Sequence, residues 1–186
     1  MESVLPVQSL YITFIVDSSG SIFVDGHRNK ISHAVRTLVQ ELSSISRQTP
    51  NQLKVFSRLL NYSSKVRWHD DSKKYSSISN LKPSFPHKGY LSNFGFALNE
   101  YRSVKPLLKQ QGKNILIWIS DGFVTDDWAP AFSELSSCPA FKDLMRFAIY
   151  PEGNVKFSTL EKFCGNVNHV ISTRDIGYYF CRNLIR

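Results

Sequence analysis

Two continuous apolar runs, each followed directly by a short polar segment, constrain the fold more than any other feature of this sequence. Residues 10–16 read LYITFIV and residues 115–119 read ILIWI. Runs so rich in β-branched and aromatic residues, without polar alternation, are typical of strands that are buried on both faces. Such strands belong to parallel sheets covered by helices, and we therefore predict two central parallel strands.

Helical and extended patterns alternate along the rest of the chain. Apolar residues from Ile31 to Ile45 recur at spacings of three and four, which predicts an amphipathic helix that ends before Pro50. A second helical pattern runs from Phe94 to Leu108. We predict a hairpin over 53–62 and 65–68, further strands over 144–150 and 169–172, further helices over 126–135, 157–164 and 175–184, and loops over 17–29 and 69–92.

This alternation predicts a three-layer α/β/α fold with a doubly wound, Rossmann-like sheet that is mostly parallel and has one antiparallel edge strand. We expect a single domain over residues 1–186, because 186 residues suit one domain of ordinary size and 42% are hydrophobic. With no secretion signal and no apolar run of membrane-spanning length, we expect a soluble cytoplasmic protein that does not bind membranes. We interpret the three cysteines as reduced thiols, since their spacing matches no metal site.

The polar segments after the two apolar runs carry the candidate chemistry. The first run leads into Asp17-Ser18-Ser19-Gly20-Ser21 and the second into Ser120-Asp121-Gly122. Ligands of such sheets bind at the carboxyl ends of the strands, so these segments should meet there. Carboxylates and hydroxyls are hard oxygen donors, suited to Mg²⁺ or to Mn²⁺ or Ca²⁺. A cation would also relieve the repulsion between Asp17 and Asp121.

These motifs resemble those of von Willebrand factor A (vWA) domains. Asp17-x-Ser19-x-Ser21 is similar to the first motif of their metal-ion-dependent adhesion site, and Asp121-Gly122 to the third. Residues 92–98 (SNFGFAL) resemble the second motif, with Ser92 in place of Thr. The resemblance covers essentially the whole chain and implies a divalent metal held by Asp17, Ser19, Ser21, Ser92 and Asp121. A vestigial site on the same fold is the alternative.

What the resemblance implies about function is metal-dependent binding of a protein partner. Ser19 and Ser21 would ligate the metal directly, Ser92 would do so in one conformational state, and Asp17 and Asp121 would act directly or through water. A Glu or Asp carboxylate of the partner would complete the shell. Where the family usually has two glycines, this chain has Tyr90 and Leu91. They would either stiffen the loop or form an apolar partner contact beside the metal.

Residues 120–128 (SDGFVTDDW) are similar to a stretch of the TerY-like vWA proteins of bacterial tellurite-resistance clusters. That group implies a role in stress response or phage defence, with a protein kinase and a metal-dependent phosphatase as partners. Asp126 and Trp128 are then candidate partner-binding residues. The alternative interpretation of both is a helix start with a packed aromatic side chain.

Residues 54–113 hold 12 Lys and Arg against 3 Asp and Glu, whereas the rest of the chain is nearly neutral. This segment could attract a polyanion such as nucleic acid or an acidic protein surface, or could simply be a solvated surface. Lys73, Lys74 and Lys88 are its candidate partner-binding residues.

An enzyme is the less favoured hypothesis. A Mg²⁺-dependent phosphohydrolase with Asp17 as nucleophile would generally have a second Asp two residues later, where this chain has Ser19. The five histidines are scattered, and the sequence has no GxSxG motif or phosphate-binding loop. We therefore expect a binding module without catalytic residues.

Overall fold

The computed structural model describes residues 8–24, 26–49, 52–85, 89–104, 112–141 and 143–185. One sheet runs through this part of the chain, with strand order β3-β2-β1-β5-β6-β7. The strands are β1 (Gln8–Asp17), β2 (Leu53–Tyr62), β3 (Val66–Trp68), β4 (Ser76–Ser77), β5 (Lys113–Ile119), β6 (Met145–Tyr150) and β7 (Val170–Ser172). The helices are α1 (Gly20–Val24), α2 (His27–Gln48), α3 (Phe94–Ser103), α4 (Ala129–Ser137), α5 (Phe157–Cys164) and α6 (Tyr178–Ile185).

The sheet has the predicted mostly parallel topology. The two apolar runs form β1 and β5, which pair in parallel at its centre, with Ile12 opposite Ile115 and Val16 opposite Ile119. β3 pairs antiparallel with β2 at one edge, which confirms the hairpin. The two-residue strand β4 also pairs antiparallel with β2, inside the segment predicted as a loop. It was missed because Ser76 and Ser77 are both exposed and carry no apolar signal.

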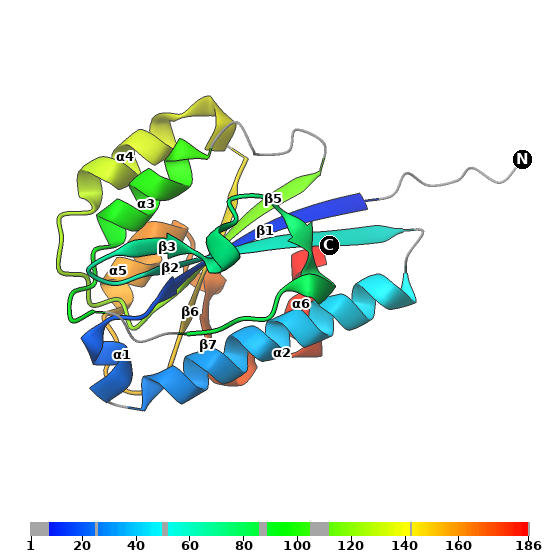
Figure 1. The fold of residues 1–186 in the computed structure, drawn as a ribbon, viewed down its shortest axis with the longest axis horizontal. Coiled ribbons are helices and arrows are strands. Elements are labelled where there is room, and N and C mark those ends of the chain that lie inside the picture. Colours follow the sequence, from blue (N-terminus) through cyan, green and yellow to red (C-terminus); the bar gives the residue numbers. More distant parts are fainter. Residues whose placement is uncertain are drawn as a thin grey trace, which may run out of the picture.

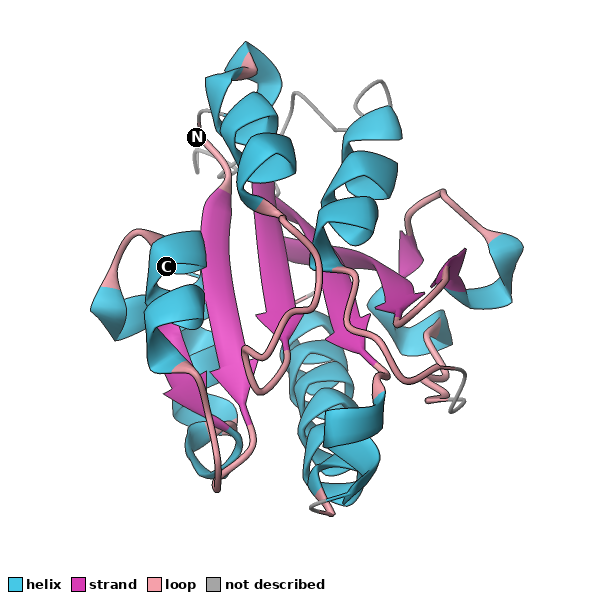
Figure 2. Cartoon of the chain, turned by 90° about the vertical axis from the view of Figure 1, so that its left-hand side faces the viewer, coloured by secondary structure: helices cyan, strands magenta, loops and turns pink. Residues whose placement is uncertain are grey.

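Each face of the sheet has its own apolar core. Alternate side chains of β1 and β5 point to opposite faces, so Ile117 packs with α1, α2 and α6, whereas Trp118 packs with α3, α4 and α5. Figure 1 shows α3 and α4 on one side of the sheet and α2 on the other. In Figure 2 the strands lie between helices on both sides, as the three-layer prediction requires.

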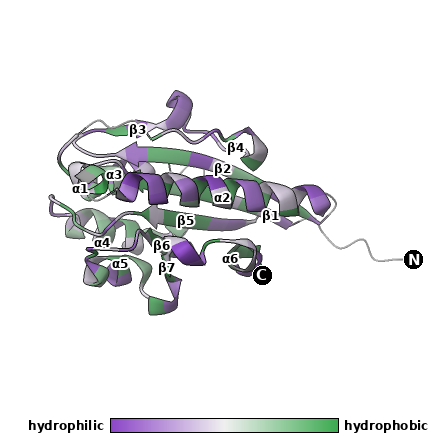
Figure 3. Ribbon diagram, turned by 90° about the horizontal axis from the view of Figure 1, so that it is seen from below, coloured by the Kyte–Doolittle hydropathy of each residue, from purple (hydrophilic) through white to green (hydrophobic). Residues whose placement is uncertain are grey.

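The helix α2 carries the predicted amphipathic pattern. Its buried positions include Ile31, Val35, Leu38 and Leu42, and the helix lies lengthwise along the sheet (Figure 3). No helix in the described ranges is long and apolar enough to cross a membrane. Cys138, Cys164 and Cys181 are free thiols, and burial raises the pKa of Cys164 and Cys181 to about 12.

Several element boundaries differ from the sequence prediction. The loop expected over 17–29 contains α1 and the start of α2, since its Ser-rich composition hid the buried apolar side chain of Ile22. The helix expected from Asp126 begins at Ala129, and the helix expected from Asp175 begins at Tyr178. In both cases an acidic residue that looked like a helix start lies in the preceding turn. Leu108, the expected end of α3, lies outside the described residues.

Candidate metal centre

Three polar segments meet at the carboxyl end of the central strands. Asp17 ends β1, Ser92 precedes α3, and Ser120 and Asp121 follow β5. Asp17, Ser19, Ser92, Ser120 and Asp121 are all buried, each with at most 2% of its surface exposed. The parallel pairing of β1 with β5 brings the first and third motifs side by side, because both strands end at the same edge of the sheet.

Asp17 is the centre of the hydrogen-bond network. Its Oδ2 atom accepts hydrogen bonds from the hydroxyls of Ser92 (2.9 Å), Ser120 (2.9 Å) and Tyr62 (3.1 Å). Its Oδ1 atom accepts one from the backbone N–H of Ser19 at 2.8 Å. These bonds hold the carboxylate in place through donors from β2, from the segments that follow β1 and β5, and from the loop before α3.

The hydrogen-bond network extends from Asp17 into the hydrophobic core. The indole Nε1–H of Trp118 donates to the Tyr62 hydroxyl at 2.9 Å, and that hydroxyl in turn donates to Asp17. The Trp118 ring stacks on Phe94, the first residue of α3, with ring centroids 3.8 Å apart. Tyr62 and Ser120 were not identified as site residues from the sequence. Strand register alone brings them to Asp17, although Ser120 could have been suspected from its place next to Asp121.

The electrostatics of the site favour a bound cation. Burial raises the pKa of Asp17, and the charge of Asp121 raises it further, although hydrogen bonds from Ser19 and Ser120 lower it. The two carboxylates are therefore near enough to repel one another across a desolvated space. A cation between them would offset both the repulsion and the desolvation.

The hydroxyls of Ser19 and Ser21 lie side by side next to this carboxylate. Their Oγ atoms are 3.3 Å apart. Neighbouring oxygens in an octahedral shell with metal–oxygen distances of about 2.1 Å are about 3 Å apart, so both hydroxyls fit one small cation. Gly20 lies between them, and a Cβ there would be 3.3 Å from the carbonyl oxygen of Tyr90. The glycine thus allows the close approach of the two loops.

The second carboxylate, Asp121, is held by the loop that follows β5. Its Oδ1 atom accepts the backbone N–H of Phe123 at 3.0 Å, and its carbonyl accepts the N–H of Lys156 at 2.8 Å. Gly122 has a φ of +82°, and a Cβ there would be 2.6 Å from the Lys156 carbonyl oxygen. Both observations explain why glycine follows Asp121.

Ser92 is tied to the loop of the third motif. Its backbone N–H donates to the Thr125 hydroxyl at 2.9 Å, and its carbonyl accepts the N–H of Thr125 at 2.9 Å. Its own hydroxyl donates to Asp17 and keeps lone pairs available for a ligand. The structure therefore brings all five predicted metal ligands to the same end of the sheet.

The chemistry of this donor set fits a hard divalent cation. It offers two carboxylates and three hydroxyls and no sulfur or imidazole, which is the set preferred by Mg²⁺, Mn²⁺ or Ca²⁺. Within the described residues, no group of three or more His, Cys, Asp or Glu could hold a metal ion. The site depends on serine hydroxyls for that reason, and its open positions would remain for water or a partner's carboxylate.

The predicted partner-binding residues occupy very different environments. Tyr90 and Leu91 lie beside the site and are 86% and 49% exposed. They therefore present the apolar surface that a partner contact beside the metal would need. Trp128 is 7% exposed and packs against Phe94 in the core. For Trp128 the structure supports the alternative interpretation, a packed aromatic at a helix start, and the partner-contact prediction is corrected.

Asp126 also has a structural role. Its Oδ2 atom accepts the backbone N–H of Gly95 at 2.8 Å, in the first turn of α3. It therefore caps α3 and not the helix that follows it in sequence. The N–H of Ala129 at the start of α4 is instead satisfied by Asp127, at 3.2 Å. Burial raises the pKa of Asp126, although hydrogen bonds from the N–H groups of the α3 turn oppose that rise.

Much of the basic excess in the described part of residues 54–113 is already engaged. Lys73 forms an ion pair with Glu100 at 2.7 Å. Arg58 is 2% exposed, and its guanidinium lies over the Tyr75 ring, 4.3 Å from the centroid. Lys74 is exposed, and Lys88 lies outside the described residues. These contacts reduce the positive charge available to a nucleic acid.

No family model matches this sequence, and no curated protein matches it. Solved structures do share its fold, which is that of vWA domains. One is proximal thread matrix protein 1 from the mussel byssus, with a zinc-occupied MIDAS motif, at a TM-score of 0.60 and 15% identity over 96% of this chain and 47% of that chain.

Two further structures are similar to a comparable degree. The manganese-loaded TRAP protein of Plasmodium vivax gives a TM-score of 0.65 at 14% identity, over 97% of this chain and 72% of that chain. A von Willebrand factor type A structure from Catenulispora acidiphila gives 0.61 at 12% identity, over 96% and 42%. The chain thus spans less than half of the mussel and Catenulispora proteins, and identities this low show the fold alone.

Proposed function

We propose that this chain, whose fold is that of vWA domains, is a metal-dependent protein–protein interaction module. The observation that carries the proposal is the 2.9 Å hydrogen bond from the Ser92 hydroxyl to Asp17, next to the Ser19–Ser21 pair. It joins residues far apart in sequence into one set of hard oxygen donors. A divalent cation bound there would offer its open positions to a Glu or Asp carboxylate of a partner.

The hydrogen bonds suggest which of the five ligands would bind the cation directly and which would act through water. The hydroxyls of Ser19 and Ser21 lie side by side, so we expect both to bind the cation directly. Oδ2 of Asp17 already accepts three hydrogen bonds, so we expect Asp17 to act through water. Ser92 and Asp121 would complete the protein's share of the shell.

The surface around the site supports a protein partner. Tyr90, Leu91 and Phe123 are large apolar side chains with 86%, 49% and 36% of their surface exposed, and they flank the buried Ser92 and Asp121. Exposed aromatic residues beside a charged centre are typical of protein interfaces. Nucleic-acid binding through Lys65, Lys74 and their neighbours is the alternative, and a steep loss of binding with salt would favour it.

The finer assignments rest on two grounds: the hard oxygen donors for the cation, and the resemblance of 120–128 to TerY-like proteins for the location, the biological system and the partners. We propose Mg²⁺ as the resident cation, a cytoplasmic location, and a bacterial stress, tellurite-resistance or phage-defence system with a kinase and a phosphatase as partners. We further propose that the chain is not an enzyme. Phosphatase activity that is lost in Asp17→Asn would overturn that last proposal.

The direct test uses the metal alone. Isothermal titration with Mn²⁺ or Mg²⁺ should give one saturable site in the wild type and none in the Ser19→Ala/Ser21→Ala double variant. Ser133→Ala/Ser136→Ala is the matched control, because both serines are exposed on α4. Equal titrations of the two double variants would contradict the metal site.

The bridging role needs a second measurement. Capture of a partner by the immobilised chain should require the divalent cation, be reversed by a chelator and be abolished by Asp121→Ala. If the partner is still captured in the presence of the chelator and by Asp121→Ala, the bridging role is refuted even if the chain binds the metal.

A further inference from the structure

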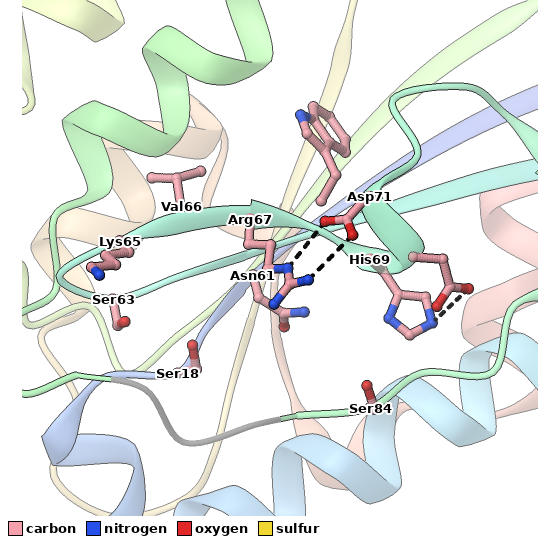
Figure 4. A pocket seen from close by; sticks show the side chains of 11 residues that line it. Ser18, Asn61, Ser63, Lys65, Val66, Arg67, His69, Asp71 and Ser84 are labelled. Carbon is pink, nitrogen blue, oxygen red and sulfur yellow. Dashed lines mark hydrogen bonds and ion pairs between the residues drawn. The ribbon is translucent and has the colours of Figure 1, made fainter.

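A cavity of about 630 Å³ lies under the β2–β3 hairpin, beside the metal centre. Figure 4 shows Asn61 and Arg67 close together on the hairpin side of it, with Ser18 and Ser63 at one end and His69 and Ser84 at the other. We call this cavity the hairpin trough. It begins at Ser18, between the candidate ligands Asp17 and Ser19, and no part of the proposed function uses it.

The deep wall of the hairpin trough is polar and incompletely satisfied. Asn61 is 9% exposed, and its buried Oδ1 atom has no hydrogen-bond partner in the protein. Ser63 is 1% exposed, and the Ser18 hydroxyl donates to the Tyr62 carbonyl at 2.9 Å, which leaves its lone pairs for a ligand. Buried polar groups are nearly always hydrogen-bonded, so this wall is suited to a ligand with hydroxyl donors.

The outer wall supplies a guanidinium. Arg67 lies directly opposite Asn61 in the β2–β3 pairing. Its Nε and Nη2 atoms donate to the two carboxylate oxygens of Asp71 at 3.1 and 3.2 Å. This two-pronged geometry is the one by which arginine also binds phosphate.

A ligand can replace Asp71 on the Arg67 guanidinium at little cost in stability. The side chains are 61% and 74% exposed, and solvent-exposed ion pairs of this kind contribute little stability. Asp70 and Asp71 both have positive φ, at 52° and 51°, a conformation that non-glycine residues seldom adopt. Asp71 therefore marks where a ligand's anionic group would sit, in exchange for a surface ion pair that contributes little stability.

We propose that the hairpin trough binds a small phosphorylated sugar. Its phosphate takes the place of Asp71 on the Arg67 guanidinium, with Lys65 nearby, and its hydroxyls bond to Asn61 and Ser63. The volume is within the range of small-molecule sites. Trp68 also lines the trough, but it is only 5% exposed and belongs to the core that packs against α3, so it offers a nucleotide base little surface for stacking, and a sugar is favoured.

The test is calorimetric titration of the full chain with ribose 5-phosphate, ribose and inorganic phosphate, all in the presence of a chelator. We expect saturable binding of ribose 5-phosphate, at least tenfold tighter than either ribose or phosphate alone. No saturable binding, or equal affinity for inorganic phosphate, would overturn the proposal. Binding that requires a divalent cation and is lost in Ser19→Ala/Ser21→Ala would overturn it too, since it would place the phosphate on the metal.

Two substitutions at exposed positions, which should change the binding affinity in opposite directions, make the test independent of folding. Arg67→Ala should weaken ribose 5-phosphate binding at least tenfold, whereas Asp71→Asn should tighten it several-fold by freeing the guanidinium. Arg36→Ala and Asp143→Asn, both exposed elsewhere, are the matched controls and should change nothing. Weaker binding in Asp71→Asn, or unchanged binding in Arg67→Ala, would contradict the assignment.

Discussion

At the scale of single residues, the key feature is that Asp17 is a buried carboxylate held by neutral donors. Its hydrogen-bond donors include one backbone N–H and three hydroxyls. They orient the carboxylate and leave its negative charge uncompensated, which is the condition under which a bound cation gains most. The same arrangement dictates how the protein should respond to pH.

Asp17 should make the metal-free protein less stable as the pH rises. Its pKa is raised by burial and by Asp121, so between the unfolded value of about 3.9 and the raised folded value the folded state binds more protons. The contribution of Asp17 to the free energy of unfolding therefore falls through that interval by about 1.4 kcal/mol per unit of pKa difference, and is constant above it.

This dependence can be measured by urea unfolding at several pH values in a chelator, with Asp17→Asn for comparison. The stability of the wild type relative to the variant should decline as the pH rises through the interval. Parallel pH curves for the two proteins would show that Asp17 does not titrate as described.

Ser92 should matter for its hydroxyl and not for its size. Ser92→Ala removes a donor to Asp17 and a candidate ligand, so we expect Mn²⁺ affinity to fall by about 10- to 100-fold. Ser92→Thr keeps the hydroxyl and should bind within a few-fold of the wild type. Isothermal titration measures both, and equal affinities of the Ala and Thr variants would exclude Ser92 as a ligand.

At the scale of elements, the loops around the site are crosslinked to one another. Thr125 bonds to both the N–H and the carbonyl of Ser92, and Asp126 caps the helix that begins two residues after Ser92. The loop after β5 therefore positions both its own Asp121 and the start of α3. Tyr90 and Leu91 extend outward from this crosslinked region into solvent.

Asp126→Ala should destabilise the protein through α3. The substitution removes the acceptor for the Gly95 N–H, and loss of such a cap costs about 0.5–2 kcal/mol. Denaturant unfolding should show this loss, together with weaker metal binding because Ser92 is next to the loosened turn. Asp143→Ala, an exposed control, should change neither. Unchanged stability in Asp126→Ala would contradict the capping role.

At the scale of the whole molecule, the site lies at the end of a sheet whose two faces are each filled by a separate core. The Trp118–Tyr62–Asp17 chain connects one core to the metal ligands. Metal binding and global stability should therefore be thermodynamically linked.

A divalent cation should stabilise the folded chain by mass action. At about 100 times its dissociation constant, the cation should raise the free energy of unfolding by about 2.7 kcal/mol, because only the folded state assembles the site. Thermal unfolding with Mg²⁺ and with a chelator would measure this. The Ser19→Ala/Ser21→Ala variant should show no shift, and an equal shift in both proteins would indicate non-specific binding.

The sequence by itself determined the architecture and the five candidate ligands. Uninterrupted apolar runs such as 10–16 and 115–119 are typical of strands buried on both faces, and parallel strands deliver the residues that follow them to one edge. Local patterns therefore sufficed to place Asp17 and Asp121 together.

Only the tertiary structure decided the partners that lie across strands and loops. Tyr62 reaches Asp17 through the register of β2 with β1, and Asp126 caps a helix that precedes it in the chain. Trp128 looked like a surface contact and is part of the core, and the Arg67–Asp71 pair depends on a positive-φ turn. Such contacts join residues far apart in sequence or depend on local backbone geometry, so periodicity and motif spacing carry no signal for them.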